Sequence, residues 1–119
     1  MSDDHITVFV RDYDASKRFY EEVLAPLGLV ALLDWPDNRR VYFGRPGEPS
    51  SLWLVESELG GRLEVTLPAA DEGAVHSFRN TAIAAGGRVE GTRVLDFDGN
   101  ALEAVYRGDE AAALRPAAA

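Results

Sequence analysis

The sequence predicts an α+β fold of two βαβββ modules, whose strands form a curved mixed sheet around a central cleft. Two observations support this prediction. The chain matches itself at an offset of 59 positions, and each half reads as a strand, a helix and then several short strands. A strand and helix pattern that repeats in this way is typical of a sheet covered by helices on one face. The 119 residues have the length of one domain.

The first module is expected to occupy residues 5–57. It begins with a strand at residues 5–10, because these residues are almost all β-branched or aromatic. Asp12 is the expected N-cap of a helix whose apolar stripe continues until Pro26 and Gly28 end it. Turn residues then separate three further strands, which are expected near 29–33, 40–45 and 51–56.

The second module is expected to occupy residues 62–107. A strand begins it, a helix follows at residues 71–85, and Gly86 and Gly87 end that helix. Short strands are then expected at 88–90, 92–97 and 101–106. Residues 108–119 read as a polar, alanine-rich tail that frays.

The internal match pairs residues of similar chemistry without a gap. The pairs are His5 with Glu64, Thr7 with Thr66, Asp12 with Asp71, Phe19 with Phe78, Leu24 with Ile83, and Gly28 with Gly87. The alternative is a chance similarity between two amphipathic units of the same type. Because the strand, cap, helix anchor and helix end all coincide, an internal repeat is favoured.

Three polar side chains are expected to converge in the cleft between the modules. Successive side chains of a strand point to opposite faces, and the aliphatic sets pack on the helices, which leaves His5, Glu64 and Glu103 on the cleft side. One imidazole and two carboxylates leave open coordination positions and suit iron, manganese, nickel or zinc as divalent ions. Without a metal, the two glutamates repel each other and one of them holds a proton.

The same alternation predicts a substrate pocket beside these residues. Its expected lining is Thr7, Phe9, Tyr42, Trp53 and Thr66. Trp53 takes the position that Glu103 has in the second module, so an indole replaces a carboxylate there. The alternative is that these aromatic rings only fill the core. Glu56 is expected on the opposite strand face in solvent, and His76 on the helix surface.

The composition excludes several classes of function. Twenty acidic against twelve basic side chains give a formal charge of −8, which repels nucleic-acid phosphates and anionic lipid surfaces. The absence of cysteine excludes thiol chemistry and disulfides. No run approaches the roughly 20 apolar residues that span a membrane, and the start of the chain is acidic, unlike a signal peptide. We expect a cytoplasmic protein with a small-molecule partner, and neither nucleic acid nor membrane.

Residues 5–107 carry motifs of a known family. These motifs are His5-Ile-Thr-Val, Asp12 through Ser16-Lys-Arg-Phe-Tyr, Val23-Leu to Pro26-Leu-Gly, Ala84-Ala-Gly-Gly, and Asp96-Phe-Asp-Gly-Asn-Ala-Leu-Glu. In them the chain resembles the glyoxalase, bleomycin-resistance and extradiol-dioxygenase superfamily, also called the vicinal oxygen chelate fold. The resemblance implies a metal held by His5, Glu64 and Glu103, a small oxygenated substrate, and a homodimer.

The chain also departs from the family pattern. Glu64 stands where better-known members have histidine, Trp53 stands at a position that carries a ligand in glyoxalase I, and only eight residues separate Gly87 from Asp96, where a longer hairpin is common. Three functions therefore stay open. The protein is a metal-dependent lyase, isomerase or dioxygenase, a metal-free protein that binds or sequesters a drug-like molecule, or a degenerate dimerisation module.

Overall fold

The computed structural model describes residues 5–48, 51–106 and 115–116, and of His5, Ser51, Arg115 and Pro116 only the backbone. The first half contains β1 (His5–Val10), α1 (Tyr13–Leu24), β2 (Val30–Trp35), β3 (Arg40–Gly44) and β4 (Ser51–Glu56), with the 3₁₀ turns η1 (Ala25–Leu27) and η2 (Pro36–Asn38). The second half contains β5 (Glu64–Pro68), α2 (Glu72–Ala84), β6 (Arg88–Glu90), β7 (Arg93–Leu95), β8 (Ala101–Val105) and β9 (Arg115–Pro116).

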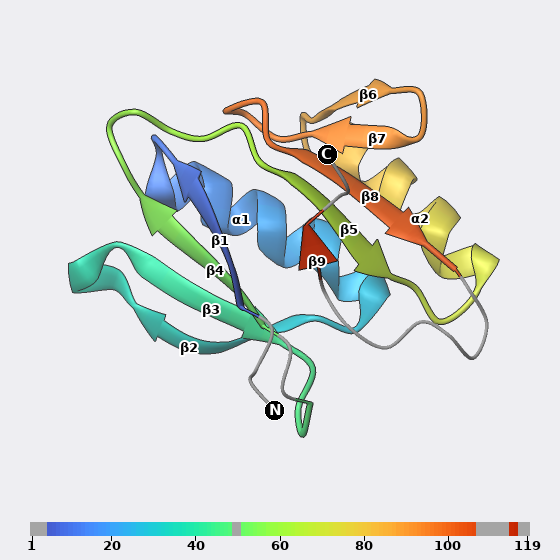
Figure 1. The fold of residues 1–119 in the computed structure, drawn as a ribbon, viewed down its shortest axis with the longest axis horizontal. Coiled ribbons are helices and arrows are strands. Elements are labelled where there is room, and N and C mark those ends of the chain that lie inside the picture. Colours follow the sequence, from blue (N-terminus) through green and yellow to red (C-terminus); the bar gives the residue numbers. More distant parts are fainter. Residues whose placement is uncertain (1–4, 49–50, 107–114, 117–119) are drawn as a thin grey trace.

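The two halves form two sheets with the same pattern of pairing. The strand orders are β1-β4-β3-β2 and β6-β7-β8-β5-β9. In each half the first and last strands of the βαβββ unit are parallel, and the other pairs are antiparallel. The sheets lie side by side with both helices on one side of them (Figure 1). The predicted α+β fold of two βαβββ modules is therefore confirmed.

The short strand β9 lies between the two sheets. It pairs antiparallel with β5 and also contacts β1 (Figure 1). No strand was expected in residues 108–119, and apart from residues 115–116 this tail, with its predicted fraying, lies outside the described part of the chain. A backbone pair of this kind extends the second sheet toward the first.

Both helices begin where the sequence predicts. The carboxylate of Asp12 accepts a hydrogen bond from the Ala15 amide at 3.1 Å, and Asp71 accepts one from the Ala74 amide at 2.7 Å. Each side chain thereby satisfies one of the amides that a helix start leaves without a partner. Equivalent caps at positions 59 apart show that the repeat extends to local detail.

The glycines that end the two helices show that one pair of the internal match, Gly28 with Gly87, is wrong. Gly28 has a φ of 80° and Gly86 a φ of 101°, and this left-handed conformation suits glycine. Gly86 is therefore the counterpart of Gly28, and Gly87 is not. Gly87 has a different role, because a Cβ atom there would lie 2.9 Å from the Phe19 ring.

The core lies between the sheets and the helices, and it contains the alternate strand residues that the sequence assigns to the helix side. These are Ile6, Val8 and Val10 of β1, Leu52 and Leu54 of β4, Val65 and Leu67 of β5, and Leu102 and Ala104 of β8. Phe19 and Phe78 are buried at equivalent positions of the two helices. The other side chains of these strands are left on the open face of the sheets.

The bounds of β2 and β7 differ most from the prediction, and the other strands end within about one residue of it. β2 continues to Trp35, because a 3₁₀ turn with Pro36 at its start ends the strand only there. β7 covers only residues 93–95, shorter than the expected 92–97. In the described part of the chain, neither helix is long and apolar enough to cross a membrane.

Candidate functional site

The open face of the first sheet carries two rows of side chains. The register aligns Thr7, Trp53, Tyr42 and Leu33 in one row, and Phe9, Val55, Arg40 and Trp35 in the next. The predicted pocket residues Thr7, Trp53 and Tyr42 therefore occupy paired positions on the neighbouring strands β1, β4 and β3. Phe9, Leu33 and Trp35 are exposed on this face although they are large and apolar. Exposed apolar side chains grouped in this way are typical of a binding surface.

An aromatic cluster forms the centre of this face. The rings of Trp35 and Trp53 are stacked, with centroids 5.5 Å apart and planes inclined by only 10°. Tyr42 meets Trp53 edge to face at 4.8 Å, and the Arg40 guanidinium lies 5.8 Å from the Trp53 centroid. Such offset stacks and cation–π contacts each contribute about 0.5–1.5 kcal/mol. Trp35 keeps 41% of its surface exposed, so another ring can stack on it.

A polar anchor fixes the strand that carries Trp35. The neighbouring residue, Asp34, points to the other face of the sheet and accepts hydrogen bonds from the Tyr13 hydroxyl at 2.5 Å and from Lys17 Nζ at 2.8 Å. These donors, Lys17 first, lower the pKa of the Asp34 carboxyl. Burial and the nearby carboxylate raise the pKa of Tyr13. The edge strand β2 is thereby tied to α1 directly beside the aromatic stack.

The two predicted carboxylate ligands lie on the open face of the second sheet. Glu103 is directly across from Thr66, and Glu64 is across from Ala101, so both carboxylates are on the same face of neighbouring strands. Each is already bonded to a neighbour. Arg93 Nη1 lies 2.9 Å from Glu64 Oε2, and the Thr92 hydroxyl donates to Glu103 Oε2 at 2.8 Å.

In this arrangement Glu64 is paired with an arginine and is not free to bind a divalent metal. A guanidinium within hydrogen-bond distance of Glu64 places a positive charge where a cation would bind. Among the described residues, no group of three His, Cys, Asp or Glu side chains is placed to hold a metal ion. The side chain of His5 lies outside the described part of the structure, so the three-residue metal site stays a prediction.

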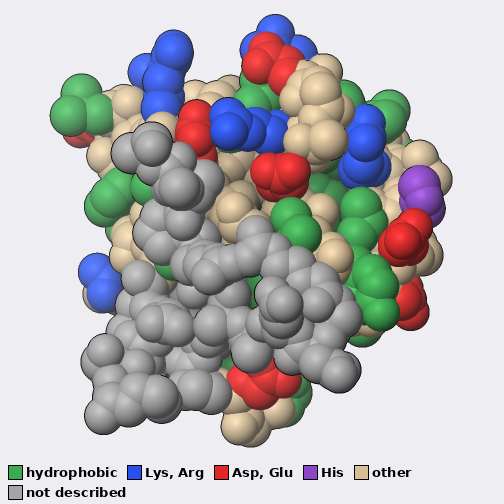
Figure 2. Space-filling view, turned by 45° about the vertical axis from the view of Figure 1, so that its right-hand side comes forward, with side chains coloured by type: hydrophobic (Ala, Val, Ile, Leu, Met, Phe, Trp, Pro, Cys, Tyr) green, Lys and Arg blue, Asp and Glu red, His purple; other side chains and the backbone are tan. Residues whose placement is uncertain are grey.

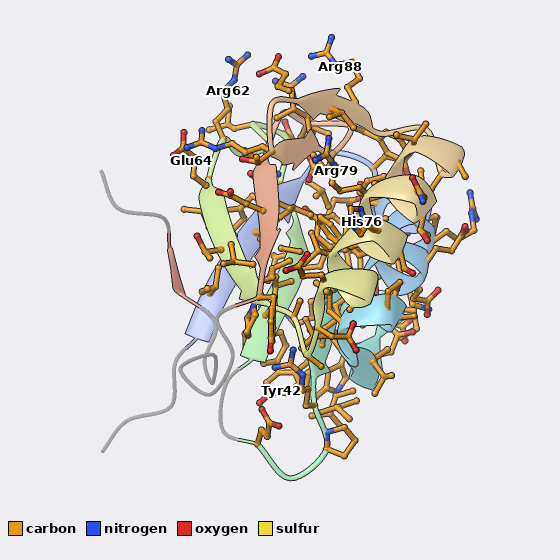
Figure 3. All side chains as sticks on the ribbon, turned by 90° about the vertical axis from the view of Figure 1, so that its right-hand side faces the viewer. Tyr42, Arg62, Glu64, His76, Arg79 and Arg88 are labelled. Atoms are coloured by element: carbon orange, nitrogen blue, oxygen red, sulfur yellow. The ribbon has the colours of Figure 1, made fainter. Side chains whose placement is uncertain are left out.

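Two other acid–base residues were part of the sequence prediction. Glu56 lies on the strand face opposite to Trp53, as predicted, and its side chain is 31% exposed. It is also a structural group, because its Oε2 accepts a hydrogen bond from the Tyr13 amide at 3.1 Å and so helps to start α1. A carboxylate beside a helix N-terminus is stabilised by the helix dipole. His76 is exposed on α2, as predicted (Figure 3).

Sequence reasoning missed Trp35, Arg40 and Arg93. A signal existed for Trp35, since it stands two positions after Leu33 and therefore on the same face of a strand that continues to Pro36. No local signal marks the contacts of Arg40 and Arg93. Long, flexible side chains choose partners from other strands, which spacing along the chain does not reveal.

Comparisons with known proteins agree with the fold. A sequence profile of the Glyoxalase/Bleomycin resistance protein/Dioxygenase superfamily matches residues 4–114. A search of curated proteins gave no match.

Several solved structures share the fold. A glyoxalase/bleomycin resistance protein from Albidiferax ferrireducens has a TM-score of 0.75 and 21% identity, over 87% of this chain and 97% of that chain. A lactoylglutathione lyase from Agrobacterium tumefaciens has a TM-score of 0.63 and 20% identity, over 87% and 91% of the two chains. The fosfomycin resistance protein FosX from Mesorhizobium loti has a TM-score of 0.63 and 13% identity, over 85% and 87%. With a profile match over most of its length, the chain belongs to the glyoxalase/bleomycin resistance protein/dioxygenase superfamily.

Proposed function

We propose that the protein binds a small planar aromatic molecule on the open face of the first sheet, without a metal. The observation that carries this proposal is the Trp35–Trp53 stack, in which the planes are nearly parallel and Trp35 stays 41% exposed. An incoming ring extends the stack by covering the free surface of Trp35. Tyr42 and Arg40 hold Trp53 in place from the neighbouring strand, so the site is formed before the ligand binds.

The chemistry of this cluster favours an aromatic ligand over a cationic one. Tryptophan attracts cations, but Arg40 already lies over the Trp53 ring. A positively charged ligand would be repelled by that guanidinium. A neutral ring gains stacking and apolar burial without this repulsion. Two structural relatives are named for small molecules, lactoylglutathione and fosfomycin, which is compatible with a small-molecule ligand here.

Calorimetric titration with quinoxaline, a neutral molecule of two fused rings, tests the proposal in buffer that contains EDTA. We expect saturable binding, and Trp35→Ala should weaken it roughly tenfold, because stacking of one ring contributes about 1–3 kcal/mol. Tyr106→Ala is the matched control, since Tyr106 is an equally exposed aromatic residue outside the cluster. Equal loss of affinity in both variants, or no binding by the native protein, would contradict the proposal.

A metal-dependent lyase, isomerase or dioxygenase is the second candidate. It is supported by the positions of Glu64 and Glu103 on one sheet face and by the register position of His5, which pairs with Ser51 as Glu64 pairs with Ala101. Arg93 would have to leave Glu64 for a metal to bind there. Metal analysis of the protein purified without chelator distinguishes the candidates. A stoichiometric iron, manganese, nickel or zinc content that His5→Ala and Glu103→Ala abolish would favour this one.

We further infer a cytoplasmic homodimer in which a second copy covers part of the open face. The exposed apolar side chains Phe9 and Leu33 support this assembly, and the cysteine-free composition suits a reducing compartment. Light scattering after size exclusion measures the mass directly. A dimer that binds no ligand would point to the third function, a dimerisation module, whereas a monomer at all concentrations would exclude the assembly.

A further inference from the structure

A cavity lies over the second sheet, away from the aromatic cluster. Its volume is about 680 Å³, within the range of small-molecule sites. The floor is one row of paired residues across four strands: Glu64 of β5, Ala101 of β8, Leu95 of β7 and Arg88 of β6. Figure 3 shows Arg62 and Arg88 at one end of the molecule and Tyr42 at the opposite end.

Arginines are concentrated on this cavity. Its lining includes Arg11, Arg62, Arg88 and Arg93, although the whole chain has only twelve basic residues and a net charge of −8. Three acidic residues share the lining, namely Glu64, Glu90 and Asp98. Figure 2 shows the same grouping, with basic side chains gathered at the upper end of the molecule and acidic ones between them. A cavity with a local excess of positive charge attracts anions even in an acidic protein.

Among the described residues, only Arg93 of these four arginines is paired with a carboxylate. Arg93 is paired with Glu64, and the Arg11 guanidinium donates to the Leu59 carbonyl at 3.4 Å. Arg62 and Arg88 have no carboxylate within 4.0 Å in residues 5–48, 51–106 and 115–116. Both side chains therefore keep their planar sets of donors available for carboxylate or phosphate oxygens.

The rest of the lining is apolar. Phe97 is 50% exposed, and Leu59 and Leu95 also line the cavity. A ligand that fits this cavity has to match both the exposed apolar side chains and the guanidiniums of Arg62 and Arg88. It has an apolar body, which covers these side chains, and an anionic group at one end.

We propose that this cavity binds a small amphipathic anion, with Arg62 and Arg88 holding its carboxylate or phosphate group and Phe97 covering its apolar part. The site does not depend on the proposed aromatic site, because it lies on the other sheet and shares no residue with it. Neither a metal nor the side chain of His5 is required.

Titration with phenyl phosphate at low ionic strength, followed by calorimetry and by NMR of the backbone amides, tests this proposal. We expect amide shifts at Leu95, Phe97 and Ala101, and at least a tenfold loss of affinity in the double variant Arg62→Gln, Arg88→Gln. Arg18→Gln, at an exposed arginine of α1 outside the cavity, is the matched control and should bind like the native protein. Added salt should weaken binding, because the contacts are ionic.

Three results would overturn the proposal. The double variant could bind phenyl phosphate as tightly as the native protein, phenol could bind as tightly as phenyl phosphate, or the amide shifts could fall outside the cavity in the native protein. The position of the amide shifts is measured on the native protein, so this test remains valid even if a substitution disturbs folding. Trp35→Ala should leave the affinity for phenyl phosphate unchanged. The proposal of an aromatic site and the proposal of an anion site can therefore fail independently of each other.

Discussion

At the scale of single residues, Asp96 accepts more hydrogen bonds than any other described side chain of the second module. It is buried, and its two oxygens accept hydrogen bonds from the Tyr20 hydroxyl at 2.6 Å, from the side chain and backbone of Asn100 at 2.9 and 2.8 Å, and from the Asp98 amide at 2.9 Å. Burial and the carboxylate raise the pKa of Tyr20 well above its ordinary value. This network joins α1 to the turn before β8.

Asp96→Ala should lower the free energy of unfolding by about 3–5 kcal/mol, because it leaves buried donors without a partner. Urea denaturation measures the loss. Asp98→Ala is the control, since the Asp98 side chain is less buried and, among the described residues, accepts one hydrogen bond, from the Arg11 amide at 3.1 Å. A loss at Asp96 no larger than the loss at Asp98 would contradict the assigned role.

The Asp34 anchor predicts a pH dependence. Its pKa is lowered in the folded protein, first by the hydrogen bond from Lys17 and then by that from Tyr13. A carboxylate with a lowered pKa stabilises the fold above its unfolded pKa of about 3.9, and this contribution disappears as the pH falls through the folded pKa. The stability advantage of the native protein over Asp34→Asn should therefore be constant near neutral pH and shrink below about pH 4. Chemical denaturation of both proteins across this range checks the sign, and a constant difference would contradict it.

Residue contacts were only partly predictable from the sequence. Strand alternation correctly separates Val65 and Leu67 from Glu64 and Thr66, because geometry fixes this pattern. The partner of Glu64 was not predictable, since Arg93 reaches it from a strand that lies beyond β8 in the sheet.

At the scale of elements, the end of α2 depends on two glycines with different functions. Gly86 supplies the left-handed turn, and Gly87 supplies space for the Phe19 ring and the Leu95 carbonyl. The N-caps Asp12 and Asp71 were predictable because capping is a local interaction. The distinction between the two glycines was not, since it depends on a ring from the other helix.

Gly87→Ala should lower the free energy of unfolding by about 1–3 kcal/mol, because the added Cβ would lie 2.9 Å from the Phe19 ring and 3.0 Å from the Leu95 carbonyl oxygen. Gly73→Ala in the first turn of α2 is the control. Its Cβ would meet only the exposed Asp71 carboxylate, at 3.3 Å, and alanine favours helix. Thermal unfolding compares the two, and an equal effect would rule out the packing explanation.

At the scale of the whole molecule, Arg45 connects the two modules. Its guanidinium donates to the Leu27 carbonyl at 2.8 and 3.0 Å and to the Pro68 carbonyl at 2.7 Å. Leu27 follows α1, and Pro68 ends β5, so one side chain bridges both halves. A planar guanidinium suits this task, because it directs several donors at fixed angles.

Arg45→Lys should lower the free energy of unfolding by about 1–3 kcal/mol, because an ammonium cannot reproduce the fork of donors. Arg18→Lys on the exposed surface of α1 should change it little. Urea denaturation followed by fluorescence and by circular dichroism measures both. A stability of Arg45→Lys equal to that of the control would contradict the bridging role.

The overall fold was predictable because the internal repeat fixes two similar modules, and the parallel pairs β1–β4 and β5–β8 follow the same register in each. The candidate site was less predictable. The sequence ended β2 at residue 33 and so omitted Trp35, which the structure stacks on Trp53. The site was harder to predict than the fold, because it depends on contacts between strands that are distant in the sequence.

The proposed aromatic site can be observed directly through its own side chains. The chain contains two tryptophans, Trp35 and Trp53, and both belong to the stack. NMR titration of ¹⁵N-labelled protein with quinoxaline in EDTA buffer should therefore move both indole N–H signals along one saturable curve. Indole signals that stay unchanged, while amides near Glu64 and Glu103 broaden with manganese in chelator-free buffer, would contradict the account and favour the metal site.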